Sequence, residues 1–162
     1  MKHWKERPFE YRALFNPAFC GLLLLRAMEG HREESETGLP FSLAFLILPI
    51  CLHKDTRDIF KAHPRSYLLK LVTEYPQMLV GFHDRCGALT PYLLEGLGMT
   101  MQCGSFKVTD SGNLLLLEKG VRKKVDGTEE SRDCQKLAWR IGRDFARIND
   151  RITIYSSFGV RP

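Results

Sequence analysis

The chain has no stretch that is long and apolar enough to cross a bilayer. Its longest apolar run, Phe41 to Leu52, contains Ser42 and Pro49 and falls short of the ~18 to 20 residues of a spanning helix. We interpret this run as a buried core helix. The first residues, Met1 to Arg7, contain no apolar core of an export signal. The sequence therefore predicts a protein without membrane contact.

Paired cysteines are also missing. The 5 cysteines are odd in number, lie far apart and form no C-x-x-C pair: Cys20, Cys51, Cys86, Cys103 and Cys134. This pattern disfavours a disulfide framework and a zinc ribbon, and it suits a reducing cytoplasm. Two mixed pairs remain, Cys51 with His53 and His83 with Cys86, but a helix would point the first pair in different directions. We predict no metal site and no cofactor.

Known catalytic patterns are absent from the sequence. It contains no G-x-S-x-G elbow, no G-x-x-x-x-G-K-[ST] loop and no G-x-G-x-x-G segment after a strand. Asp110 and Glu118 give a superficial likeness to a metal nuclease, but the E-x-K spacing is missing and Asp110 suits a turn. We predict that the chain is not an enzyme, with a hydrolase that uses these two carboxylates as the remaining enzymatic alternative.

Length and composition favour one folded unit. With 162 residues, 44% of them hydrophobic, the chain can bury a core but is too short for two comfortable ones. We therefore predict a single domain over 1–162, of the α+β class and mainly helical. The net charge of +5 is a moderate excess that favours an acidic or anionic partner.

Caps and breakers divide the first half of the chain into helices. Asn16 and Pro17 predict a helix start, and Gly30 predicts its end, followed by a loop over 31–38. We expect a second helix to open at Leu39-Pro40 and to be bent or interrupted by Pro49. The further helices are expected from Asp55 or Thr56 to Ala62, over 67–74, and from Pro76 onward.

A helix followed by a hairpin is the most informative pattern. Thr90-Pro91 predicts the start of a helix over 91–103, and Gly104 predicts its end. Two β-prone runs at 106–109 and 114–117 predict a hairpin after it. We interpret residues of about 66–118 as a winged-helix-like core. Such cores read DNA or dock onto proteins, and the fold alone does not decide between these functions.

The charges of the helix over 91–103 disfavour DNA reading by that helix. Its polar side chains are Tyr92, Glu95, Thr100 and Gln102, and it contains no Arg or Lys, although phosphate and base contacts come mostly from cationic and amide side chains. Its Gly and Met residues favour close packing, either against another protein or within this domain.

The best basic surface lies near the C-terminus. We expect an amphipathic helix over about 128–149 and a short apolar tail over 151–162. One face of this helix is apolar, and the other carries a basic stripe with Trp139 beside it. A basic connection precedes the helix. The predicted contact residues for a partner or a DNA backbone are Arg122, Lys123, Lys124, Arg132, Lys136, Trp139, Arg140, Arg143 and Arg147. A simply solvated charged face is the plain alternative.

Several segments match a known family as a set. They are Asn16 to Arg26, Gly38 to Phe41 with Ala44 to Ile50, Leu52 to Arg57, Leu79 to Arg85, Gly142-Arg143 with Phe145-Ala146, and Phe158 to Pro162. Together they resemble the middle components of bacterial three-component ABC systems. In that family an aromatic residue usually follows the Gly-Arg pair, where this chain has Asp144, and an Arg-Glu pair often stands at Leu94-Glu95.

The resemblance implies a non-enzymatic adaptor or regulatory subunit. It would bridge an SMC or Rad50-like ABC ATPase, which senses aberrant DNA, and an effector that is often a nuclease, as in Lamassu-type anti-phage defence. A further contact with DNA inside such a complex is compatible with the basic helix face. The alternative is a winged-helix DNA-binding protein or transcriptional regulator, which would bind phosphates through the basic connection after the hairpin, including Lys119, or through the last helix.

Overall fold

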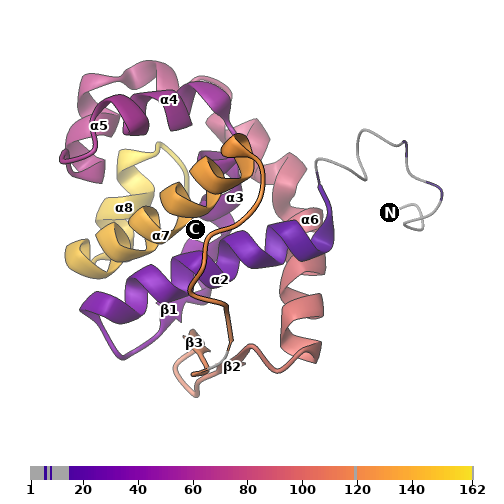
Figure 1. The fold of residues 1–162 in the computed structure, drawn as a ribbon. Coiled ribbons are helices and arrows are strands. Elements are labelled where there is room, and N and C mark those ends of the chain that lie inside the picture. Colours follow the sequence, from indigo (N-terminus) through magenta and orange to yellow (C-terminus); the bar gives the residue numbers. More distant parts are fainter. Residues whose placement is uncertain (1–5, 7, 9–14, 119, 162) are drawn as a thin grey trace.

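A long central helix organises the fold (Figure 1). The computed structural model describes residues 6, 8, 15–118 and 120–161, so most of Met1 to Arg7, where we expect no export signal, lies outside the described residues. The central helix α2 (Pro17–Glu34) packs against α7 (Glu129–Ile148) and α6 (Phe82–Gln102). The hairpin lies at one end of the molecule, and α4 and α5 lie at the other.

The start of α2 is as predicted, but its end is not. The Asn16 side chain accepts a hydrogen bond from the Ala18 amide at 2.8 Å, and Pro17 is the first helical residue. The helix continues past Gly30 to Glu34, so the predicted loop over 31–38 is limited to Ser35–Gly38. Gly30 instead lies at the contact with α7, where a Cβ would be 2.8 Å from the carbonyl carbon of Trp139.

The segment after α2 begins with a short strand, β1 (Leu39–Pro40), where we expected the second helix to open. Leu39 pairs antiparallel with Leu114 across the sheet, and this tertiary pairing overrides the local preference for a helix start. The buried helix α3 (Phe41–Cys51) then follows with Pro49 inside it, so Pro49 does not interrupt the helix.

Three short elements connect α3 to α6. They are α4 (Lys54–Ala62), α5 (Leu68–Glu74) and the 3-10 helix η2 (Pro76–Leu79). The cap of α4 is His53 rather than Asp55 or Thr56, and its Nδ1 lies 2.9 Å from the Thr56 hydroxyl. α5 begins one residue after its predicted start and ends as predicted. The helix predicted from Pro76 onward is interrupted, because η2 ends at Leu79 and Gly81 takes a left-handed conformation before α6 (Phe82–Gln102) begins.

One continuous helix, α6, replaces the two predicted helices that meet at Thr90-Pro91. Pro91 lies in its interior and lacks the N–H that would bond to the Gly87 carbonyl. The Thr90 hydroxyl bonds to the Cys86 carbonyl at 2.8 Å in the same turn. Because α6 packs along α2, the helix remains continuous despite the proline.

The end of α6 and the hairpin are confirmed. Gly104 has φ +66° and its amide bonds to the Met101 carbonyl, while the Ser105 amide bonds to the Thr100 carbonyl, which is the Schellman arrangement that a glycine permits. The strands β2 (Phe106–Val108) and β3 (Asn113–Leu116) follow, and the sheet order is β1-β3-β2, all antiparallel. The predicted mainly helical α+β class is therefore correct.

The C-terminal part contains one helix more than predicted. α7 begins where the predicted helix begins, with Thr128 as its cap. The Thr128 hydroxyl accepts from the Ser131 amide, and the apolar face of the helix is buried as expected. The expected apolar tail forms α8 (Arg151–Ser157). Asp150 caps α8, and Ile154 is fully buried, so the apolar residues of the tail are organised by packing.

One hydrophobic cluster runs through the described residues from Cys20 to Val160, with α2 and α3 at its centre. None of the helices in the described ranges has the length and apolar content of a membrane span.

Candidate partner-binding groove

A groove of about 870 Å³ opens on the polar side of α7. Residues from α2, α4, α7 and the connection 121–128 line it, and we call it the basic groove. Eight of its lining residues are Arg or Lys and three are Asp or Glu. Its apolar surface comes mainly from Pro64, Val125 and Trp139, because the lining residues Phe60 and Leu137 are buried.

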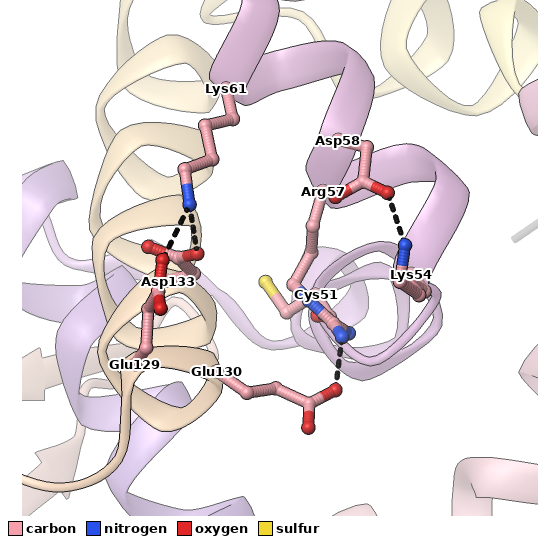
Figure 2. Close-up of polar contacts among 8 residues, drawn as sticks. All are labelled: Cys51, Lys54, Arg57, Asp58, Lys61, Glu129, Glu130 and Asp133. Atoms are coloured by element: carbon pink, nitrogen blue, oxygen red, sulfur yellow. Dashed lines mark hydrogen bonds and ion pairs between the residues drawn. The ribbon is translucent and has the colours of Figure 1, made fainter.

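Ion pairs fix α4 against α7 along one side of the groove (Figure 2). The buried Arg57 donates to the Cys51 carbonyl at 3.0 Å and also pairs with Glu130. The Lys61 ammonium lies 2.8 Å from an Asp133 carboxylate oxygen and 3.2 Å from one of Glu129. These two cations therefore hold a wall of the groove in place.

Arg140 fixes the corner between α4 and α5, with Asp144 buried nearby. The Arg140 guanidinium donates to the carbonyls of Phe60, His63 and Ser66, and it stacks over the Phe60 ring at 4.8 Å. Burial lowers the pKa of Arg140 and raises the pKa of Asp144, which is only 4% exposed. One carboxylate oxygen of Asp144, Oδ2, is buried in this corner without a hydrogen-bond partner.

The opposite wall depends on Arg26, which is only 2% exposed. Its guanidinium donates to Glu29 at 2.9 Å, to the Lys124 carbonyl at 3.0 Å and to Gln135 at 3.3 Å. A single buried cation thereby joins α2, the basic connection and α7.

The remaining cations of the groove do not hold its walls together. Arg32, Lys123 and Lys136 are exposed, and within the described part of the chain their side chains make no hydrogen bond or ion pair. Arg143 stacks over the Trp139 ring at 4.6 Å, but its buried Nε has no hydrogen-bond partner. These four side chains, which we call the open cations, come from α2, the connection and α7.

The structure brings together part of the predicted contact set. Five predicted residues line the groove: Lys123, Lys136, Trp139, Arg140 and Arg143. Four do not: Arg122, Lys124, Arg132 and Arg147. Trp139, expected beside the stripe, is half-buried, with its indole N–H 3.2 Å from Glu33.

The basic stripe of α7 is not one uniform charged face. Arg147 pairs with Glu34 at 2.6 Å, Lys124 in the connection pairs with Asp126 at 3.1 Å, and Arg140 is bonded to carbonyls. Arg122 and Arg132 are exposed outside the groove. Lys119, which the DNA-binding alternative also uses, lies outside the described residues. The contact roles of these residues stay predictions.

Sequence reasoning missed the groove residues of α2 and α4. Arg26 carried a usable signal, because a cation inside the run Leu22 to Ala27 must find partners when the helix is buried. Arg32 and Arg57 gave no comparable signal. Their position beside α7 is a result of the tertiary packing.

The two thiols that suggested a metal site, Cys51 and Cys86, are shielded from solvent. Burial raises the pKa of Cys51 and raises that of Cys86 to about 11, so both thiols are protonated. Asp110 lies exposed in the turn of the hairpin. Among the described residues no three His, Cys, Asp or Glu side chains are grouped to hold a metal ion.

Residues 4–162 match the family model described as ABC-three component (ABC-3C) system Middle Component 3. The match spans almost the whole chain, and the protein belongs to this family, as the resemblance predicted. Comparisons with curated proteins and with solved structures gave no match.

Proposed function

We propose that this chain is a non-enzymatic adaptor of a three-component ABC system. It joins an SMC or Rad50-like ABC ATPase to an effector, which we expect to be a nuclease, in an anti-phage defence complex of the Lamassu type. Family membership supports an accessory subunit of such a system. The finer role rests on the surfaces of the molecule.

Two separate surfaces support the adaptor role. One is the basic groove with its open cations. The other consists of exposed apolar side chains on α6 and the hairpin, among them Leu94, Met101 and Val108, each about half exposed (49%, 52% and 49%). The residues that line the groove include none from α6. A small protein with two unlike surfaces is suited to contact two partners at once.

The bridging role predicts that the effector binds the ATPase only when this chain is present. When the ATPase carries an affinity tag and all three components are expressed together, the effector should co-purify at low salt. When this chain is omitted, the effector should be lost from the ATPase. Equal recovery of the effector with and without the chain would contradict bridging, and absence of the chain from the purified ATPase would contradict the adaptor role.

The alternative function is a winged-helix DNA-binding protein. The order of the elements favours it: a helix, a short strand, further helices and a hairpin, with the sheet order β1-β3-β2. In addition, Arg122 and Lys123 follow the hairpin with exposed side chains. The recognition helix gives it little support. Thr100 is buried and its hydroxyl bonds to the Gly96 carbonyl, and Arg85 bonds to the carbonyls of Met78 and Val80.

This alternative makes a quantitative prediction. The isolated chain should bind duplex DNA at ~50 mM salt with a steep dependence on salt, because phosphate contacts release counterions. Replacing Arg122, Lys123 and Lys124 by Ala should then lower the slope of log K against log salt by about 3. A fluorescence-anisotropy titration measures both quantities. No binding at ~50 mM salt would exclude DNA binding by the isolated subunit.

A further inference from the structure

The cations of the basic groove divide into two sets by their partners. Arg26, Arg57, Lys61 and Arg140 are bonded to carboxylates, carbonyls or an amide oxygen and hold the walls together. The open cations Arg32, Lys123, Lys136 and Arg143 are not needed for this. The structural set therefore builds a fixed concave site, and the open set leaves it with unpaired positive charge.

The open cations surround the groove instead of covering one flat face. Lys136 and Arg143 are seven residues apart on α7, so they lie about 10 Å apart along its axis on the same side. Arg32 approaches from α2 and Lys123 from the connection. The Arg143 Nε is buried beside the groove without a partner, and such a donor is costly to leave unpaired. Because this nitrogen is closed to solvent, a ligand can reach only the rest of the Arg143 side chain, which lines the groove.

The apolar surface of the groove distinguishes between two classes of anionic ligand. Pro64, Val125 and Trp139, none of them fully buried, line it together with the carboxylates of Glu29 and Glu33. Nucleic-acid interfaces are more polar and more strongly positive than this, and carboxylates beside the cations repel a phosphate backbone. A peptide that carries both carboxylates and apolar side chains can satisfy both parts of the surface.

We propose that the basic groove binds an acidic segment of another component of the three-component system, with apolar side chains of that segment against Pro64, Val125 and Trp139. This inference rests on the proposed adaptor function and adds the chemistry of one of its contacts. Lys136 and Lys123 bind carboxylates of the segment at the rim, and Arg143 binds one deeper in the groove.

Zero-length crosslinking tests the contact directly. A carbodiimide joins a lysine amine only to a carboxylate that it touches, so the purified complex should give crosslinks from Lys123 or Lys136 to Asp or Glu of another subunit. Lys61, which contacts Asp133 and Glu129 within this chain, should crosslink to them and serves as the internal control. Mass spectrometry identifies the linked peptides. Internal crosslinks without any from Lys123 or Lys136 to another subunit would overturn the proposal.

Matched charge reversals test the energetics. The double variant K123E/K136E changes two groove residues, and R122E/R132E changes their exposed neighbours on the same two segments outside the groove. Both variants change the net charge equally. We expect K123E/K136E to lower the affinity for the subunit that crosslinks to the groove at least about tenfold at ~50 mM salt, and R122E/R132E to lower it less than about twofold.

The remaining outcomes separate this inference from the adaptor function. If the complex forms but the two variants weaken it equally, or not at all, the groove does not bind the segment and the adaptor function stands. If K123E/K136E weakens binding of a 30-bp DNA duplex but not of the subunit, the ligand is a nucleic acid and the proposal fails. If the wild-type chain binds neither subunit, the adaptor function fails first.

Discussion

Replacing Gly142 by Ala should lower the free energy of unfolding more than any substitution of an exposed residue. A Cβ at this position would lie 2.6 Å from the carbonyl carbon of Ala27 in α2, and Gly30 of α2 makes the reciprocal close approach to Trp139. The obstacle is backbone, so no side chain can rotate away. We expect a loss of about 3 kcal/mol in the free energy of unfolding, which lowers the melting temperature by about 6–12 °C in a domain of this size.

A helix glycine without neighbours gives the matched control. Gly98 lies inside α6, and a Cβ there would have nothing within 4 Å. Gly98→Ala should therefore be neutral or should stabilise the protein by about 0.5–1 kcal/mol, through helix propensity alone. Urea unfolding followed by circular dichroism measures both variants. If Gly142→Ala unfolds like Gly98→Ala, α2 and α7 do not meet as closely as described.

Removing the guanidinium of Arg140 should also lower the free energy of unfolding strongly. Arg140→Met keeps the length of the side chain but leaves the carbonyls of Phe60, His63 and Ser66 without their donor. Because each unpaired buried carbonyl costs about 1–3 kcal/mol and this corner is only partly buried, we expect a total loss of about 3 kcal/mol. Arg140→Lys should recover a part of it, since an ammonium cannot reproduce the planar fork of donors.

The same helix offers a control for this loss. Arg132 is exposed two turns before Arg140 and makes no contact of this kind within the described residues, so Arg132→Met should change the stability by less than about 0.5 kcal/mol. Chemical denaturation again gives the comparison. A similar small change for both variants would mean that Arg140 is free to contact a ligand and does not support the α4–α5 corner.

The stability of Arg140→Met also bears on the basic groove, because Arg140 positions Phe60 and Pro64 at its edge. Arg140, which was predicted to contact a partner, thus stabilises the fold itself. Charge and helical spacing placed Arg140 on the polar face of α7. They carry no information about the backbone carbonyls at the end of α4 that lie beside Arg140 in the folded protein.

Local signals were sufficient where the interaction itself is local. Asn16 caps α2 through the Ala18 amide two residues later, and Gly104 ends α6 with bonds inside its own last turn. The hairpin turn at 109–112 likewise closes on itself. Local signals failed where distant segments decide. Leu39 is in a strand because Leu114 lies beside it, and Pro91 is inside a helix because α6 packs along α2.

The sequence by itself determined the mainly helical α+β class, the helix before the hairpin, the amphipathic α7 and the family. All of these depend on residues that are near each other in the chain or on a pattern along it. Only the tertiary structure decided which cations are open. Arg26, Arg57, Lys61 and Arg140 are occupied by partners that lie far away in sequence, while Lys123 and Lys136 are not. The sequence gives the charge of each side chain, but the tertiary packing decides whether an acceptor or an acidic side chain lies close enough to pair with it.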